Sequence, residues 1–511
     1  MIVLKCLLVS LGVVWLLGAT SPGFAQPAEG EAAAARAFDA TRDNGPARRM
    51  FLERMPKGAD LHSHMSGAVY AENIIAWASE DGWCADAGYF LSPPPCDATA
   101  GRRPLIEVAR DVKSFRDAVD AFSVRNYHRR SVSGHNQFFT TFFRFGAYLP
   151  KRYGDILAEV AQRAGRQNVQ YLELMESPQM FAAAALGGKL GPSDDLAGLY
   201  RKLQEDGLPE LVAQARRDYA DAMSRKDAVL GCERTPKPAG CEVAIRWLAQ
   251  VIRTFPPEMV FAQIALAFDL ARGNNGIVVG LNLVAPEDDQ ITLQTYSQQM
   301  RMIGFLREMY PTVQISLHAG ELALGLVPPE DLRFHIREAI EVAGAKRIGH
   351  GIDIAHEEGA DVLLRRMARE GIMVEINLTS NEVILGVKGS DHPFLLYRKY
   401  GVPMALSTDD EGVSRIDLTH EYQRAADTYR LGYRDLKALS RNSLTYSFLP
   451  GASVWADPAK GRVVAACGAD RLGSVRPSAS CASFLAVSEK ARMQWRLEER
   501  SNAFEASLAQ K

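Results

Sequence analysis

Residues 313–321 read VQISLHAGE, an apolar run typical of a buried strand that ends in His318 and, after a glycine, Glu321. Three further motifs place metal-type or carboxylate side chains beside a predicted strand in the same way. They are Asp60-Leu61-His62-Ser63-His64, Arg347-Ile348-Gly349-His350-Gly351 and Ser407-Thr408-Asp409-Asp410. The motifs lie too far apart in the chain to form one local site. Parallel α/β barrels bring distant strand ends together and carry their chemistry at the C-terminal ends of the strands, so the motifs favour that fold.

From Met55 onward, short apolar runs alternate with amphipathic helical segments, the rhythm of a parallel sheet. Eight such runs are present, which is the number that a closed TIM (β/α)8 barrel requires. The predicted strands are Gly58–His62, Val169–Leu174, Val260–Ala267, Ile277–Leu283, Val313–Leu317, Arg347–Gly349, Ile372–Ile376 and Pro403–Ser407.

The spacing of these strands predicts how the 511 residues are organised. Long gaps follow the first and second strands, so we expect insertions at about 80–135 and 180–255 within a barrel that covers 55–450. A lead-in rich in Ala, Gly and Pro, extended or loosely helical, precedes the barrel at 26–54. A C-terminal extension over 451–511 ends in a predicted helix, Phe484–Leu508.

The N-terminus has the order of a secretory signal. Lys5 precedes an apolar stretch, Cys6–Ala19, and small residues follow up to Ala25. A membrane anchor is the alternative, but about fourteen apolar residues fall short of the roughly 20 that span a bilayer. We therefore expect cleavage of residues 1–25 and export to a periplasm or to the outside, with no remaining membrane attachment.

Cysteine usage agrees with export, and the net charge bears on possible partners. When Cys6 leaves with the signal, six cysteines remain in three sequence-local pairs, which read as disulfides in an exported protein. The pairs are Cys84/Cys96, Cys232/Cys241 and Cys467/Cys481. A zinc or iron–sulfur site is the alternative, but CxxC spacing is missing. The formal net charge of −2 argues against nucleic acid as a partner. A homo-oligomer is possible.

The four motifs together form a metal-hydrolase set. On a strand, His62 and His64 point to the same face and can share one metal. Each motif also has a simpler reading: His318 as a core histidine, Glu321 as a helix-capping acid, and the Asp409-Asp410 pair as a helix N-cap. Their combination favours zinc, because three imidazoles and one carboxylate suit that ion. Glu321 and His350 would then be free to move protons beside a metal-activated water.

The motifs MPKGADLHSH, SLHAGE, RIGHGID and ALSTDD resemble those of the adenosine deaminase family of metal-dependent hydrolases, and the signal and enlarged first insertion resemble its secreted, growth-factor-related branch. The resemblance implies one zinc ion per chain, with a purine nucleoside as the small-molecule substrate. The implied ligands are His62, His64, His318 and Asp409. Glu321 would protonate purine N1, His350 would orient and help deprotonate the water, and Asp410 would bind N7.

Three positions depart from the family pattern, and all three lie near the sugar or the purine edge. Ser66 stands where an acidic residue commonly contacts the ribose. Ala285 stands where a glycine N–H meets purine N3, and Glu411 follows Asp410 where proline is common. The metal and proton-transfer positions are intact, so we expect a deaminase acting on adenosine or a related 6-aminopurine nucleoside.

Two other functions remain open at this point. Another mononuclear amidohydrolase is the nearest alternative; a two-metal member would often carry a bridging lysine on the fourth strand, and residues 277–283 contain none. A barrel-based extracellular binding or signalling protein is the second alternative, although a decayed enzyme would be expected to lose a ligand or Glu321. The aromatic run His135–Phe143 resembles the family's helix at the substrate entrance, but we interpret most of its rings as a core helix face.

Overall fold

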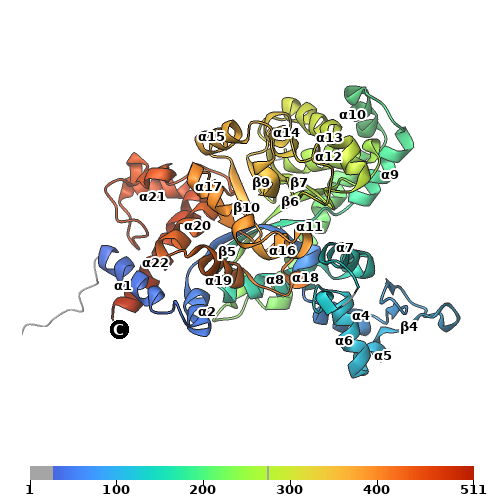
Figure 1. Cartoon of the computed structure of the whole chain (residues 1–511), viewed down its shortest axis with the longest axis horizontal. Coiled ribbons are helices and arrows are strands. Elements are labelled where there is room, and N and C mark those ends of the chain that lie inside the picture. The colour runs from blue at the N-terminus through green and yellow to red at the C-terminus, as the bar shows by residue number, and fades with distance from the viewer. Residues whose placement is uncertain (1–26, 130, 273–275, 511) are drawn as a thin grey trace, which may run out of the picture.

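Eight parallel strands form the centre of the molecule, in a computed structural model that describes residues 27–129, 131–272 and 276–510 (Figure 1). The strand order is β1-β5-β6-β7-β8-β9-β10-β11, and each neighbouring pair is parallel. A single bridge between Ser63 and Asp409 joins the two edges, so the barrel is nearly closed. The strands are β1 Gly58–His64, β5 Val169–Met175, β6 Ala244–Ile252, β7 Val278–Val284, β8 Gln314–Ala319, β9 Arg347–His350, β10 Met373–Ile376 and β11 Met404–Leu406.

The predicted third strand is wrong. Val260–Ala267 lies inside helix α12 (Pro257–Ala271), and the third barrel strand is β6. Almost every side chain of α12 is buried, because the helix packs against β6 and β7 on one side and other helices around it. A helix buried all round shows no amphipathic period, so its apolar run resembles that of a buried strand. The other seven strands are confirmed to within two residues at their ends.

Helical insertions follow β1 and β5, as predicted. The first includes a small three-stranded sheet, β2 (Cys84–Ala85), β3 (Leu91–Ser92) and β4 (Arg103–Pro104), which projects from one corner of the molecule (Figure 1). The second is shorter than the predicted 180–255, because that range includes β6. It consists mainly of helices α9 (Met180–Leu190), α10 (Leu196–Glu205) and α11 (Leu208–Leu230).

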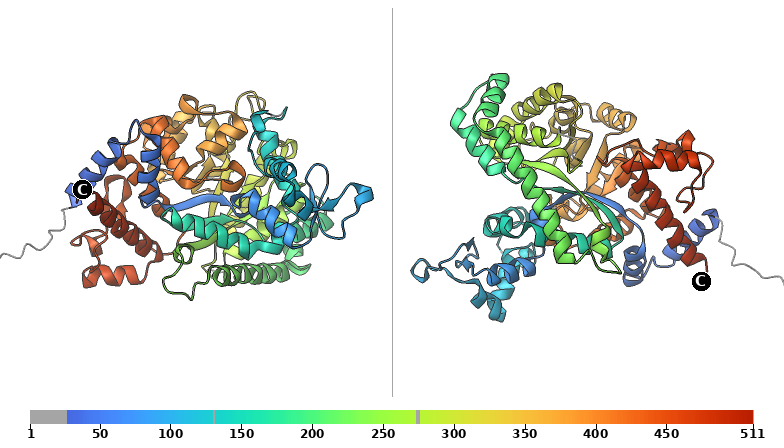
Figure 2. Two further views of the ribbon diagram at one scale, coloured as in Figure 1. Left: turned by 90° about the horizontal axis from the view of Figure 1, so that it is seen from below. Right: turned by 180° about the vertical axis from the view of Figure 1, so that it is seen from behind.

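The segments before and after the barrel pack together. The lead-in forms α1 (Pro27–Asp39) and α2 (Gly45–Arg54), and α1 lies against the final helix α22 (Glu489–Ala509; Figures 1 and 2). The predicted single helix Phe484–Leu508 is instead two helices, α21 (Ala479–Ala486) and α22. The break follows from the Ser488 side chain, which accepts the N–H of Ala491 and caps α22.

The C-terminal helices also close the floor of the barrel. Apolar side chains inside β1, β5, β10 and β11 form one cluster with residues of α20 (Tyr433–Thr445) and α22. The cluster consists of Ala59, Leu61, Tyr171, Met373, Ala405, Leu444, Leu449, Met493 and Leu497. The N-terminal end of the barrel is therefore a packed core, which leaves the C-terminal end for chemistry.

The six cysteines meet in the three predicted pairs, with each pair of sulfur atoms at bonding distance. The predicted signal segment, residues 1–25, lies outside the described residues. Among the helices that the structure describes, none has the length and apolar character needed to cross a membrane.

Candidate metal centre and active site

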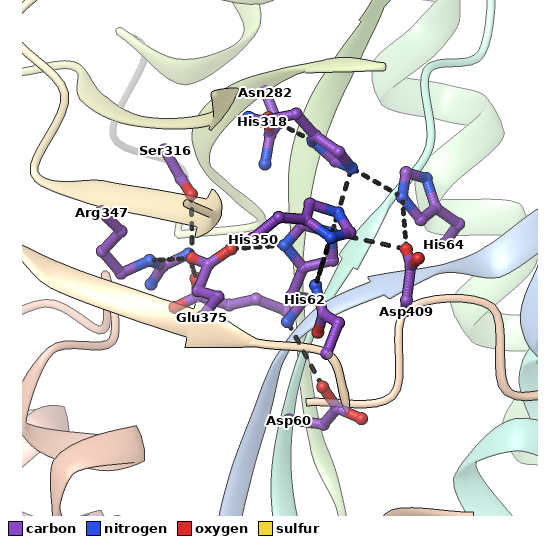
Figure 3. A network of polar contacts seen from close by, with 12 residues as sticks. Asp60, His62, His64, Asn282, Ser316, His318, Arg347, His350, Glu375 and Asp409 are labelled. Carbon is purple, nitrogen blue, oxygen red and sulfur yellow. Dashed lines mark hydrogen bonds and ion pairs between the residues drawn. The ribbon is translucent and has the colours of Figure 1, made fainter. Parts of the chain in front are cut away.

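Four side chains from distant parts of the chain converge at the C-terminal end of the barrel (Figure 3). His62 and His64 come from the end of β1, His318 from β8, and Asp409 from the residues that follow β11. The Nε2 atoms of His62 and His64 lie 3.0 and 3.2 Å from Nε2 of His318. They lie 3.4 and 3.2 Å from Oδ1 of Asp409. The structure thus brings together the four predicted ligands.

The hydrogen bonds behind the rings fit a bound cation. Nδ1 of His62 faces Glu375 Oε2 at 2.6 Å, and Nδ1 of His318 faces Asn282 Oδ1 at 2.9 Å. Both partners are acceptors, so each Nδ1 carries the proton and each Nε2 keeps a free lone pair. Such lone pairs would repel each other and the Asp409 carboxylate at these distances unless a cation lies between them. The donor set of three imidazoles and one carboxylate fits zinc.

Glu375 is the main support of the first histidine. Its carboxylate also accepts from Arg347 Nε at 2.6 Å and from Ser316 Oγ at 2.8 Å (Figure 3). Burial alone would raise the pKa of Glu375, but Arg347 and His62 outweigh it and hold that pKa at about 2. Glu375 is therefore ionised and fixes the tautomer of His62. This role was not predicted from the sequence, where its signal is a lone carboxylate inside the apolar strand 372–376.

The fourth ligand also forms the seam of the barrel. Asp409 has a φ of 58°, and its second carboxylate oxygen accepts from Ser380 Oγ at 2.6 Å. Beside it, Thr408 Oγ1 donates to Asp60 Oδ2 at 2.6 Å and so links β11 to β1 a second time. The pairing of β1 with β5 is irregular between Asp60 and Ser63, and a bulge of this kind re-aims side chains.

Glu321 lies beside the converging ligands, within reach of Asp409 and His350. It follows Gly320, whose φ of +73° turns the chain at the end of β8. The side chain is buried, and Oε1 has no hydrogen-bond partner among the residues that the structure describes. Burial first and the nearby Asp409 second raise the pKa of Glu321 well above its usual value. A protonated carboxyl group here can donate a proton into the site.

His350 is fully buried and close to both Glu321 and the ligands. Its Nδ1 lies 3.5 Å from Glu321 Oε1 and 2.8 Å from the side-chain amide nitrogen of Asn381. Burial is the main reason that the pKa of His350 falls to about 3, so the ring is neutral. Asn381, which the sequence analysis did not single out, holds the ring in place.

Asp410 faces the same space from the other side. Its carboxyl group packs directly on Gly67 in α3 (Met65–Ala68), since a Cβ at position 67 would lie 1.6 Å from Asp410 Oδ1. That oxygen is buried, and the described part of the chain offers it no hydrogen-bond partner. Burial and the adjacent Asp409 raise the pKa of Asp410 well above its usual value, which favours the protonated form that can donate a hydrogen bond.

The two predicted substrate contacts, Ser66 and Ala285, also lie at this end of the barrel. Ser66 is half-buried in α3, next to the Gly67–Asp410 contact. Ala285 follows β7 with a φ of +78°, a conformation that favours glycine. Its carbonyl oxygen accepts from Arg253 Nε at 2.9 Å. The structure places both residues near the site, and their contacts with a substrate stay a prediction.

The aromatic run forms α7 (Gly134–Phe145), with Phe138 and Phe145 buried and Phe142 half-buried. The interpretation as a core helix face is therefore confirmed for these rings. At its start, His135 Nε2 lies 3.0 Å from Asp288 Oδ1 and so links α7 to the loop after β7.

The strand order and the residues at the strand ends define a TIM barrel of the amidohydrolase type. The family model for adenosine deaminase matches residues 117–454. An adenosine deaminase of Clostridium perfringens is 36% identical over 78% of this chain and 96% of its own length. The N6-methyl-AMP deaminase of Danio rerio is 25% identical over 78% of this chain and 92% of its own length.

Similarity to solved structures supports the same fold. The zinc-bound crystal structure of an amidohydrolase from Burkholderia ambifaria superposes with a TM-score of 0.51 and 18% identity. That comparison covers 79% of this chain and 88% of the other. The family match and the Clostridium relative lead to one conclusion: the chain belongs to the adenosine deaminase family and is a hydrolytic deaminase.

Proposed function

We propose that this protein uses one zinc ion to deaminate adenosine, or a closely related 6-aminopurine nucleoside, to the 6-oxo product and ammonia. The observation that carries the proposal is the convergence of His62, His64, His318 and Asp409 on one point, with the buried carboxyl groups of Glu321 and Asp410 close by. When bound there, zinc lowers the pKa of water and supplies a nucleophile at neutral pH.

The carboxyl groups of Glu321 and Asp410, in their protonated forms, match the acceptors on a purine ring. N1 and N7 both accept hydrogen bonds, so a partner for either must donate. Glu321 would donate a proton to N1 and make C6 electrophilic, while Asp410 would donate to N7. Oxygen from water then bonds to C6, the bond from C6 to the exocyclic nitrogen breaks, and ammonia leaves. The neutral His350, held by Asn381, would orient the attacking water and help remove its proton.

The nucleoside itself is the finer part of the proposal. The relatives include both an adenosine deaminase and an N6-methyl-AMP deaminase. Ser66 would hydrogen-bond a sugar hydroxyl, and the N–H of Ala285 would meet purine N3. We further propose export with signal cleavage near Ala25, because the three sulfur pairs would be stable disulfides in an oxidising compartment.

The experiment follows the ultraviolet absorbance of adenosine, 2'-deoxyadenosine, adenine and N6-methyl-AMP with zinc-loaded protein, each with and without a chelator. The expected result is loss of adenosine absorbance that stops on chelation and returns with zinc. Turnover of N6-methyl-AMP alone would overturn the nucleoside assignment. No turnover of any of the four would refute the proposed function.

A further inference from the structure

We infer that Glu287 and Arg253 form a positioning pair that fixes Glu321 and Ala285 relative to each other. The pair would hold the carboxyl group that protonates purine N1 and the N–H that binds purine N3 in the right relative position. The inference rests on the proposed function, because it assigns these residues to support the groups that would contact N1 and N3. Neither residue reaches the reacting atoms; both act through the main chain. They sit just after strands β7 and β6.

Glu287 holds the turn that carries Glu321. Its Oε1 accepts the main-chain N–H of Gly320 at 3.0 Å, and its Oε2 accepts that of Glu321 at 2.8 Å. Both residues are buried, so loss of the acceptor would leave each N–H without the water that could replace it. Two acceptor oxygens on one carboxylate therefore set the direction in which the Glu321 side chain leaves the main chain.

Arg253 holds the neighbouring strand ends. Its side chain is completely buried; Nε donates to the carbonyl oxygen of Ala285 at 2.9 Å, and Nη1 donates to that of His318 at 3.2 Å. The left-handed conformation of Ala285 is strained for a residue with a Cβ. A charge-assisted hydrogen bond to its carbonyl oxygen offsets that strain and fixes the direction of its peptide plane.

The two side chains belong to one buried unit. Arg253 Nη1 lies 3.7 Å from Glu287 Oε2. Glu287 Oε1 also faces His335 Nδ1 at 2.6 Å, and the ring of His335 stacks on Tyr296 with centroids 3.7 Å apart. These contacts hold the Glu287 carboxylate in place from the side of His335. A shift of the Glu287 side chain would therefore also shift the Gly320–Glu321 turn, to which it is hydrogen-bonded.

The first variant is Glu287→Gln, in which one oxygen becomes an amide NH2 that cannot accept an N–H. We expect kcat for adenosine to fall on the order of 10- to 100-fold, with KM and zinc content close to wild type. The matched control is Glu357→Gln. Glu357 is also a buried carboxylate that accepts two main-chain N–H groups, from Ile336 at 2.6 Å and Arg337 at 3.2 Å, but it caps α14 (His335–Glu341) instead.

The second variant is Arg253→Lys, which keeps a positive charge beside Glu287 but loses the planar donor to Ala285. Wild type should bind adenosine more tightly than 3-deazaadenosine, which has a C–H in place of N3. We expect the ratio of the 3-deazaadenosine Ki to the adenosine KM to fall by about fivefold in the variant, the loss of about one hydrogen bond.

The outcomes separate the two proposals. Wild-type protein that does not deaminate adenosine refutes the proposed function. If wild type is active and Glu287→Gln has the same kcat for adenosine, the positioning role is overturned. The role is also overturned if Glu357→Gln lowers kcat as much as Glu287→Gln does. If Glu287→Gln yields no folded protein, the test is the ratio of the 3-deazaadenosine Ki to the adenosine KM in Arg253→Lys. A ratio equal to that of wild type overturns the inference. Failure of both variants to fold would make the pair a stability element and also overturn it.

Discussion

The main-chain N–H of Asp409 donates to the carbonyl oxygen of His62 at 2.9 Å, and the N–H of His64 donates to the carbonyl oxygen of Asp409 at 3.2 Å. These bonds form the seam between the last and first strands of the barrel. The side chains of the same three residues converge on the proposed zinc position. Barrel closure and metal binding therefore depend on the same short stretches of chain.

Replacing Glu321 by glutamine should separate metal binding from proton transfer. Glutamine has the same shape but no acidic proton, so kcat should fall on the order of 10²- to 10⁴-fold. Zinc content, measured by elemental analysis, should stay at the wild-type level because Glu321 is outside the ligand set. A variant with full turnover would contradict the role of Glu321 as the acid.

Replacing Glu375 by glutamine should weaken zinc binding. Glutamine cannot accept hydrogen bonds from His62 on one side and from Arg347 and Ser316 on the other, so the His62 ring loses its fixed orientation. The expected fall in zinc affinity is about 10- to 100-fold, measured by competition with a chromophoric chelator. Glu341→Gln, at an exposed ion pair with Arg366, serves as the control. Equal affinity in the two variants would show that Glu375 does not support the ligand.

Replacing Gly67 by alanine should displace Asp410. The new methyl group would lie 1.6 Å from Asp410 Oδ1, so the carboxyl group must move away from the purine. We expect KM for adenosine to rise by about tenfold, on the order of one lost hydrogen bond, with zinc content unchanged. Gly188→Ala is the control, because its added methyl would meet Met259 at an ordinary 3.5 Å. An unchanged KM in Gly67→Ala would argue against Asp410 as a substrate contact.

Acid should destabilise the fold through Glu287. Burial would raise the pKa of Glu287, but Arg253 and His335 outweigh it and lower that pKa from 4.5 to about 2. A lowered carboxyl pKa gives stability that is present above pH 4.5 and is lost as the pH falls toward 2. It corresponds to about 3 kcal/mol. Urea unfolding should show wild type more stable than Glu287→Gln at pH 7, with the difference shrinking below pH 4.5. A difference independent of pH would contradict this assignment.

The strand-end motifs could be predicted from the sequence because their chemistry is local. A histidine or aspartate that ends an apolar run marks the C-terminal end of a parallel strand, and that was enough to predict the barrel and the four converging side chains. The error at Val260–Ala267 arose because a helix buried on every side has the composition of a buried strand. The Pro256-Pro257-Glu258 start was the available signal for a helix.

The supporting contacts could not be predicted in the same way. Glu375 and Asn282 support their histidines across 313 and 36 positions of sequence, and Glu287 reaches Glu321 across 34. No local pattern encodes these pairings, which depend on which strands become neighbours and on the direction of each side chain. Ala285 is an intermediate case: the sequence shows an alanine at a position that favours glycine, but only the structure shows that Arg253 holds it.

The most direct test of a single catalytic zinc ion is a titration of chelator-treated protein with zinc, followed by adenosine turnover and by thermal unfolding. With one catalytic zinc ion, turnover should be absent at the start, rise in proportion to zinc and stop rising at one equivalent per chain. The melting temperature should rise over the same range, because zinc binds the folded state, and His64→Ala should show neither rise at these concentrations. Full turnover before zinc is added, or turnover that keeps rising to two equivalents, would contradict a single catalytic zinc ion.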